Sequence, residues 1–280
     1  RSSKYDSSRL KVQISNFEKH NIEYCIIEEQ YENSSLKTHF KSSKHIVVGP
    51  DYLESNTLAK FNRVGWQCGD YVAYIGYDFF PNYNFYWIVD SDLYLNLDLN
   101  DFICKTNKLD FDCLATNYGV SNSNNWIWHQ SMLEEYNTVY KMLFGLVRLS
   151  NSAVSFLKEK RIRYCQNFKR NQYGTFFAND ESFTATVLTN EGFTCQQLQK
   201  VIPEYFSNNL FSLSHLFHID ELDEIYAKDQ IIHPLCDSAT FKIKINSLLK
   251  NNQRELILNR TYRFFCRYNE EKYKDLSSVP

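Results

Sequence analysis

Short apolar runs alternate with segments of helical periodicity along most of this chain, and this alternation limits the possible folds more than any other feature. The apolar runs occupy residues 22–29, 44–50, 85–89, 111–119, 142–150 and 193–198, and the helical segments occupy residues 5–21, 53–80, 150–162 and 179–192. Continuous apolar runs are typical of strands in a parallel sheet that helices cover on both faces. The sequence therefore predicts an α/β fold with a mostly parallel, Rossmann-like sheet flanked by helices and a helical C-terminal segment.

Length, charge and cysteine content exclude several classes of protein. A chain of 280 residues, 43% hydrophobic and 23% charged, has enough apolar material for one large domain and lacks the composition of a disordered chain. The net charge of −2 argues against a nucleic-acid partner. The eight cysteines form no CxxC pair, and no apolar run approaches the length of a membrane span, so we expect a cytoplasmic protein.

Two carboxylates follow the most apolar run directly. Residues 85–89 (FYWIV) lead into Asp90, Ser91 and Asp92. Ligands of such sheets gather beyond the carboxyl ends of the strands, and carboxylates are suitable ligands for Mn²⁺ or Mg²⁺. Both carboxylates project the same way if the strand stays extended, whereas a turn at Asp92 would separate their roles. The other interpretation is that the three residues only form the turn after the strand.

The motif resembles the D-x-D strand of nucleotide-sugar glycosyltransferases with the GT-A fold. "YWIVDSDLYL" carries the resemblance, and "GWQCGDY", "DFDCLATNYG", "NDESF" and "IIHP" occur in a similar order around it, over residues 8–236. The resemblance implies a catalytic domain over 1–236, with a donor half (1–115) and an acceptor half (116–236). It also implies transfer of a sugar from a nucleotide-sugar donor to a hydroxyl of a glycan acceptor, as in bacterial lipopolysaccharide or capsule synthesis.

The resemblance further implies roles for single residues on the donor side. Asp90 and Asp92, with Ser91 between them, would hold the metal and the donor diphosphate, and His233 would complete the metal site; His215 and His218 are weaker candidates. Asp70 would contact the nucleotide. The alternatives are a histidine that only precedes a proline turn and an aspartate that only caps a helix.

Candidate residues on the acceptor side are two carboxylates and two tryptophans. Asp180, ahead of Glu181, matches the helix-start carboxylate that serves as general base in inverting GT-A enzymes, although helix capping alone explains both residues. Trp126 and Trp128 lie in a polar stretch, residues 120–130, which is expected to form a loop. Their indole faces would stack on an acceptor sugar or, alternatively, fold back onto the core.

Both ends of the chain carry further expectations. GT-A enzymes begin with a strand that contacts the nucleotide base, so a strand is expected upstream of Arg1 or within residues 1–5. The C-terminal extension, residues 237–280, is basic and mainly helical. It would either contact an anionic membrane surface or pack as an ordinary helix. Its basic residues are Lys242, Lys244, Lys250, Arg254, Arg260, Arg263 and Arg267.

Two other functions remain open from the sequence. Haloacid-dehalogenase-type phosphatases carry a similar motif, in which Asp90 would be the nucleophile and Asp92 the acid/base, assisted by Lys158 and the carboxylates of residues 180 and 181. Tyr94 in place of threonine or valine, and the position of the motif far from the N-terminus, count against this function. A degenerate glycosyltransferase domain that binds sugar without turnover is the other alternative.

Overall fold

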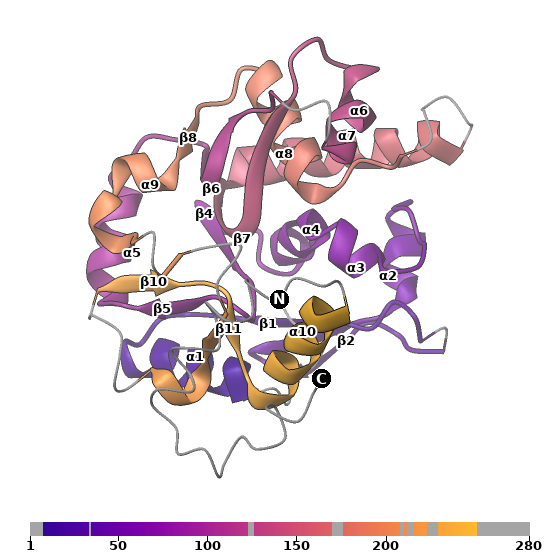
Figure 1. Cartoon of the computed structure of the whole chain (residues 1–280). Coiled ribbons are helices and arrows are strands. Elements are labelled where there is room, and N and C mark those ends of the chain that lie inside the picture. Colours follow the sequence, from indigo (N-terminus) through magenta and orange to yellow (C-terminus); the bar gives the residue numbers. More distant parts are fainter. Residues whose placement is uncertain are drawn as a thin grey trace.

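The computed structural model describes residues 8–33, 35–122, 126–169, 176–207, 210–211, 216–222 and 229–250. Helices and strands alternate along these ranges, so the chain has a mixed α/β fold (Figure 1). None of the helices in this part of the chain is both long and apolar enough to cross a bilayer.

The N-terminal part of the chain builds a three-stranded sheet and the helices that follow it. Its elements are α1 (Ser8–Lys19), β1 (Ile26–Glu29), β2 (His39–Ser42), β3 (His45–Val48), α2 (Pro50–Ser55), α3 (Val64–Gln67) and α4 (Asp70–Phe79). β1 pairs in parallel with β3, and β3 pairs antiparallel with β2, so β1 is an edge strand of this sheet. The single helical segment predicted over 53–80 is wrong in part, because residues 56–63 and 68–69 lie outside α2, α3 and α4.

A four-stranded sheet lies at the centre of the molecule. It and its helices comprise β4 (Phe85–Val89), α5 (Leu99–Asn107), β6 (Cys113–Val120), α6 (Ile127–Leu133), β7 (Tyr140–Ser150), α7 (Asn151–Lys169), α8 (Asp180–Asn190), β8 (Cys195–Gln197) and α9 (Leu198–Val201). The strand order is β4-β7-β6-β8; β7 runs antiparallel to both β4 and β6, and β8 runs parallel to β6. The prediction of one large, mostly parallel sheet is therefore wrong for the described residues.

The apolar runs reflect burial on both faces of this sheet and not the direction of its strands. On one face, Leu114 and Leu146 pack in a cluster with side chains of α5 and α9. On the other face, Ala115 and Val147 pack with α4, α7 and α8. Figure 1 shows these two groups of helices on opposite sides of β6 and β7. An antiparallel strand covered in this way needs apolar residues at every position, just as a parallel one does.

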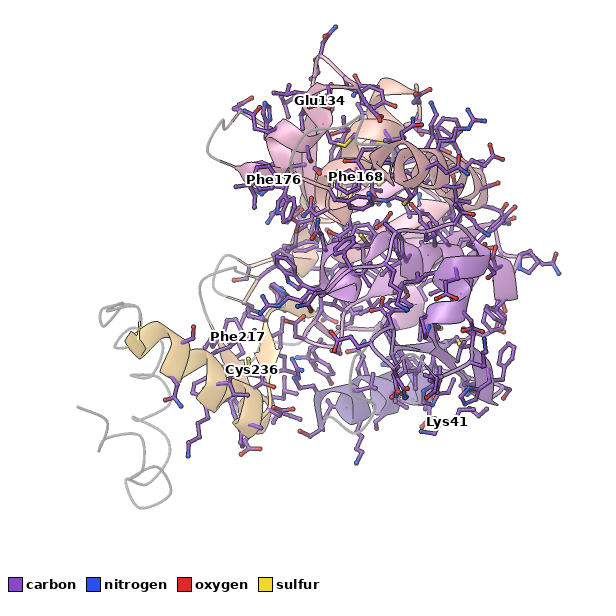
Figure 2. All side chains as sticks on the ribbon, turned by 90° about the vertical axis from the view of Figure 1, so that its right-hand side faces the viewer. Lys41, Glu134, Phe168, Phe176, Phe217 and Cys236 are labelled. Carbon is purple, nitrogen blue, oxygen red and sulfur yellow. The ribbon has the colours of Figure 1, made fainter. Side chains whose placement is uncertain are left out.

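The C-terminal strands return to the residues that follow the D-x-D motif. The remaining elements are β5 (Tyr94–Asn96), a 3₁₀ turn at Pro203–Tyr205, β9 (Phe217–His218), a 3₁₀ turn at Ile219–Glu221, β10 (Gln230–Ile232), β11 (Leu235–Cys236) and α10 (Ser238–Lys250). β10 pairs antiparallel with β5, and β11 pairs in parallel with β9. Figure 2 shows Phe217 and Cys236 in the part that carries α10, and Phe168 and Phe176 in the part formed by α7 and the residues before α8.

Most predicted elements are present, and the exceptions concern residues 120–130 and the end of the chain. The structure contains the helices expected near residues 5–21, 150–162 and 179–192 and the six expected strands. The expected loop over 120–130 is wrong in part, because α6 begins at Ile127. The helical C-terminal segment is confirmed over α10, whereas residues 251–280, with four of the basic residues named above, lie outside the described part.

Candidate functional site

The D-x-D motif lies on a turn at the end of β4. The backbone N–H of Asp90 donates to the carbonyl of Gly145 in β7 (2.9 Å), and the N–H of Leu93 donates back to the carbonyl of Asp90 (3.1 Å). This i to i+3 bond closes a β-turn around Ser91 and Asp92. The extended arrangement, in which both carboxylates project the same way, is therefore not the one found. All three motif residues are half-buried.

Strand pairing brings the late histidine next to this turn. In the β5–β10 ladder Tyr94 pairs with Ile232, so His233 follows directly on one strand and Asp92 lies two residues before Tyr94 on the other, which makes them neighbours. The N–H of Leu235 donates to the carbonyl of Asp92 at 2.6 Å. The Asp92 Oδ1 and His233 Nε2 atoms are 3.9 Å apart, and His233 is only 8% exposed. The structure therefore brings these two candidate residues together, as their order in the sequence led us to expect.

Gly145 of β7 lies beside both Asp90 and His233. Its carbonyl anchors Asp90, and the His233 Nε2 atom lies 4.0 Å from the position that a Cβ on Gly145 would take. A side chain larger than alanine at this position would therefore meet the imidazole ring.

Glu181 approaches the same point of β7 from the first turn of α8. Its carboxylate accepts hydrogen bonds from the backbone of Phe144 and, at 3.4 Å, from Asn179 Nδ2. Burial is the largest influence on this carboxyl group, and together with the nearby charge of Asp90 it raises the pKa of Glu181 to about 7, against the lowering effect of the two hydrogen bonds. The Glu181 carboxyl group therefore exchanges its proton near neutral pH.

Asp180, the first choice for a catalytic base from the sequence, has a different position. It is only 4% exposed, and its Oδ2 accepts a bond from the Gly69 N–H (2.9 Å) and its Oδ1 one from the Glu181 N–H (2.8 Å). Asp180 thus ties the start of α8 to the start of α4. The geometry reverses the order of the two candidates and favours Glu181.

The expectation that Asp70 contacts a nucleotide is wrong for this structure. Asp70 is fully buried, where its Oδ2 accepts bonds from Arg161 Nε (2.7 Å) and from the Tyr74 hydroxyl (2.7 Å). The side chain does not cap α4 either, since the N-cap residue is Gly69. Asp70 and Arg161 form a buried ion pair between α4 and α7, which no local sequence pattern indicates.

The tryptophans predicted to bind an acceptor lie at and within α6. Trp126 is the N-cap residue of this helix, and Trp128 lies in its first turn; both are half-buried. The Trp128 ring pairs with that of Trp66 in α3, with ring centroids 6.4 Å apart and an interplanar angle of 59°. Trp66 is 67% exposed. Sequence reasoning missed Trp66 because it lies in a segment read as an ordinary helix.

Asp92 and His233 are the residues of this site that could hold a divalent metal ion, because a carboxylate oxygen and an imidazole nitrogen are suitable ligands and these two atoms are 3.9 Å apart. Across the described residues, however, no three histidine, cysteine, aspartate or glutamate side chains form a ready metal site. Asp90 does not complete such a group here, and the Lys244 Nζ atom lies 3.8 Å from Asp92 Oδ2. Other ligands of the ion would have to come from the substrate or from solvent.

The remaining candidates from the sequence that the structure describes contact other residues. His218 is buried and bonded to the Asp220 N–H and the Ser238 hydroxyl, and His215 lies outside the described residues. Lys158, the lysine of the phosphatase alternative, pairs with both carboxylate oxygens of Asp78 at 2.6 and 2.7 Å. Lys158 thus has Asp78 as its ion-pair partner, whereas the phosphatase alternative needs this lysine beside Asp90.

No protein-family model matches this chain, and none of the curated proteins has a similar sequence.

Proposed function

We propose that this protein is a metal-dependent glycosyltransferase that moves a sugar from a nucleotide-sugar donor to a hydroxyl of a glycan acceptor. One observation carries the proposal: Asp90, Glu181 and His233 converge on Phe144 and Gly145 of β7, and Asp92 adjoins His233, although these residues come from three distant parts of the sequence. A D-x-D turn, a carboxylate at a helix start and a late histidine are the features expected of the GT-A fold, which is the finer fold assignment that we propose.

The donor side consists of Asp90, Asp92, His233 and Lys244. Asp92 and His233 would hold the metal, and Asp90 would join them once a donor is bound. When present, Mn²⁺ or Mg²⁺ would offset the negative charge that develops on the departing nucleoside diphosphate. The Lys244 ammonium group near Asp92 adds a second positive charge on this side, which suits a diphosphate.

Glu181 is the base in this proposal. The acceptor hydroxyl oxygen forms a bond to the anomeric carbon of the donor sugar, and the hydroxyl proton passes to the Glu181 carboxylate. The bond between the anomeric carbon and the diphosphate oxygen breaks, and its electron pair leaves with the nucleoside diphosphate. A base works best when its pKa lies near the working pH, and the pKa of Glu181, at about 7, meets this condition.

Trp66 and Trp128 would bind the acceptor. Exposed indole faces stack on the C–H faces of sugars, and Trp66 presents most of its surface to solvent. Their helices adjoin α8: Gln67 of α3 donates to the carbonyl of Phe177, just before Glu181. The setting that we propose is the synthesis of a bacterial surface polysaccharide, with the basic C-terminal extension (237–280) in contact with the inner surface of the membrane.

A panel of nucleotides tests this proposal directly. Thermal unfolding is measured with UDP, GDP, CMP and their sugar conjugates, with and without Mn²⁺. A bound ligand stabilises the native state by about 2.7 kcal/mol at a hundredfold excess over its Kd. We expect a rise in Tm for one nucleotide that needs Mn²⁺, disappears in Asp92→Asn and persists in Asp110→Asn, a control at an exposed aspartate.

Two results would count against the proposal. A well-folded protein that responds to no nucleotide, with or without Mn²⁺, lacks the donor site. A phosphoryl group trapped on Asp90 during incubation with a phosphate ester would favour the phosphatase alternative instead.

A further inference from the structure

Two cysteines lie side by side on neighbouring strands of the central sheet, away from the candidate site. In the parallel ladder of β6 and β8, Cys113 pairs with Cys195. Residues paired in this way point to the same face of a sheet, and both side chains pack in the cluster formed with α4, α7 and α8. The partner of Cys113 on β7 is Leu149, whereas the candidate site adjoins Gly145. The fold therefore brings together two thiols that are far apart in the sequence and that the proposed reaction does not use.

The Cys195 thiol has the surroundings of a reactive cysteine. A hydrogen bond from the Cys113 thiol is the largest influence on it and lowers the pKa of Cys195, against the effect of burial. Hydrogen bonds with the hydroxyl groups of Thr189 and Tyr118 act in the same direction. These two hydroxyl oxygens lie 2.6 Å apart, so they form one polar group beside the sulfur. The thiolate is the nucleophilic form of cysteine, which makes Cys195 the nucleophile of the pair.

Cys113 is placed to react second. It is fully buried, and its hydrogen bond to Cys195 raises the pKa of the Cys113 thiol, so this thiol keeps its proton. Cys195 is half-buried and belongs to β8, which is an edge strand of the sheet. A small molecule from solvent therefore meets Cys195 before it meets Cys113.

The spacing of the two strands permits a bond between the sulfur atoms. Neighbouring strands lie about 4.8 Å apart, and a disulfide joins Cα atoms that are about 4.4–6.8 Å apart. Because Cys113 and Cys195 are direct partners in the ladder, their Cα atoms meet this requirement without a shift of either strand.

We propose that Cys113 and Cys195 form a peroxide-responsive thiol pair, in which hydrogen peroxide converts the two thiols into a disulfide that joins β8 to β6. The Cys195 thiolate attacks one peroxide oxygen, the O–O bond breaks, and the departing hydroxide takes up a proton to give water. The Cys113 sulfur then attacks the sulfur of the Cys195 sulfenic acid. The S–O bond breaks, and its oxygen leaves as water with the Cys113 proton. The two sulfur atoms together lose two electrons, which one molecule of hydrogen peroxide accepts.

The disulfide would change the local stability of the sheet edge. β8 has only three residues, and short edge elements are among the first parts of a fold to open. A covalent bond to β6 would oppose this opening until a thiol reductant restores the two thiols. The proposal does not rest on the glycosyltransferase function.

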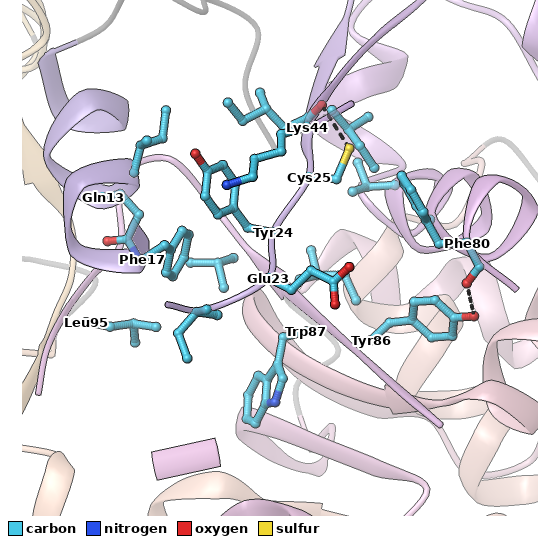
Figure 3. Close-up of a pocket in the computed structure, with 18 of the residues that line it drawn as sticks. Gln13, Phe17, Glu23, Tyr24, Cys25, Lys44, Phe80, Tyr86, Trp87 and Leu95 are labelled. Carbon is cyan, nitrogen blue, oxygen red and sulfur yellow. Dashed lines mark hydrogen bonds between the residues drawn. The ribbon is translucent and has the colours of Figure 1, made fainter. Parts of the chain in front are cut away.

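Cys25 provides a matched control within the same chain. It is half-buried like Cys195, and it lines a mainly apolar cavity of about 460 Å³ between the three-stranded and the four-stranded sheet (Figure 3). Its thiol donates to the carbonyl of Ile26 at 3.6 Å, and burial raises the pKa of Cys25 to about 11. Cys25 is therefore protonated at neutral pH and should react slowly with peroxide.

Peptide mapping of the peroxide-treated protein tests the proposal. The full chain is reduced, freed of reductant and treated with hydrogen peroxide; the remaining thiols are then blocked and the peptides identified by mass spectrometry. We expect a disulfide-linked peptide pair that contains Cys113 and Cys195, with Cys195 consumed at least about tenfold faster than Cys25. Hydrogen exchange over residues 195–197 should slow, and dithiothreitol should reverse both changes. Cys104→Ala, at an exposed cysteine, should leave these results unchanged.

Two variants separate the steps of the reaction. In Cys113→Ala the sulfenic acid has no second thiol, so a cyclic 1,3-diketone that labels sulfenic acids should accumulate on Cys195. In Cys195→Ala the thiol of Cys113 should stay unmodified, while Cys25 reacts as it does in the parent.

Three results would overturn the proposal. The folded, peroxide-treated parent could contain no disulfide between Cys113 and Cys195. Cys195 could be consumed no faster than Cys25, which would make it an ordinary thiol. The sulfenic-acid label could appear on Cys113 in place of Cys195, which would reverse the assigned roles. The first two results come from the parent chain alone, so they decide the question even if a variant fails to fold.

Discussion

Asp180 and Glu181 illustrate how adjacent carboxylates acquire different chemistry from position alone. Successive helical residues point about 100° apart, so one side chain of the pair faces the core and the other faces β7. Asp180 accepts two backbone N–H groups, whereas Glu181 lies half-buried beside the charge of Asp90. The sequence marks both as good first-turn residues of a helix and does not distinguish them.

The Glu181 carboxyl group should make stability depend on pH. Its pKa is about 4.5 in an unfolded chain and about 7 in the fold, so its contribution to stability is fully present below pH 4.5 and is lost as the pH rises through 7. Glu181→Gln removes this dependence. We expect the variant to gain up to about 3 kcal/mol over the parent between pH 5 and pH 8, measured by urea unfolding. Equal pH profiles would show that Glu181 titrates normally.

The same substitution should affect catalysis if Glu181 is the base. Removal of a general base lowers the rate by a factor of about 10² to 10⁴. We expect Glu181→Gln to lose this factor in sugar transfer while the nucleotide-induced rise in Tm stays unchanged. Glu159→Gln, at an exposed position of α7, is the control and should keep full activity. Full activity of Glu181→Gln would remove the carboxylate from the reaction.

At the scale of elements, α8 and its cap control where Glu181 lies. The Asn179 side chain accepts from the Ser182 N–H (3.0 Å) and donates to Glu181. Asn179→Ala should cost about 1 kcal/mol through loss of the cap. It should also move the midpoint of the pH–rate profile upward, because the bond from Asn179 lowers the pKa of Glu181. Asn179→Asp, which keeps the cap but not the donor, should retain stability better than alanine does.

Two ion pairs join α4 and α7, and they should differ greatly in strength. Arg161 and Asp70 are fully buried, whereas Lys158 and Asp78 are partly exposed. Breaking a buried pair leaves an uncompensated charge and costs about 3–5 kcal/mol. We therefore expect Arg161→Met to lose this amount in urea unfolding and Lys158→Met to lose about 0–1 kcal/mol.

A double variant separates charge from packing at this position. Arg161→Met combined with Asp70→Leu should recover much of the loss, since no buried charge remains. A double variant as unstable as Arg161→Met alone would assign the loss to the ring contacts of Arg161, which lies 3.7 Å from the Phe183 ring centroid.

At the scale of the whole molecule, sequence patterns located the strands and helices well and their partners poorly. An apolar run reports burial on both faces, which β7 has while running antiparallel to its neighbours. The pairing of β5 with β10 depends on contacts between distant segments, for which short strands carry no local signal. The order of the motifs predicted that Asp92 and His233 belong to one site. The segments around Lys244 and Trp66 carry no such motif, so their positions near the candidate site were not predicted.

The β5–β10 pairing should connect local stability with ligand binding. Ile231 is fully buried between these strands and the core, and Ile231→Ala should cost about 2–5 kcal/mol. Because β10 positions His233, the Ile231→Ala variant should lose Mn²⁺-dependent nucleotide binding at a lower urea concentration than the one at which its central sheet unfolds. Leu157→Ala in α7, equally buried, should lower stability without separating the two transitions.

The return of β10 to β5 also has a consequence for biosynthesis. A ribosome adds about 5–20 residues per second from the N-terminus onward. All four strands of the central sheet have emerged once Gln197 leaves the ribosome, whereas His233 and Lys244 are still inside or unmade. The nascent chain thus holds Asp90, Asp92 and Glu181 before either basic partner arrives. The site is therefore completed after the central sheet, and translation that stops between residues 198 and 232 yields all four strands of that sheet without His233 and Lys244.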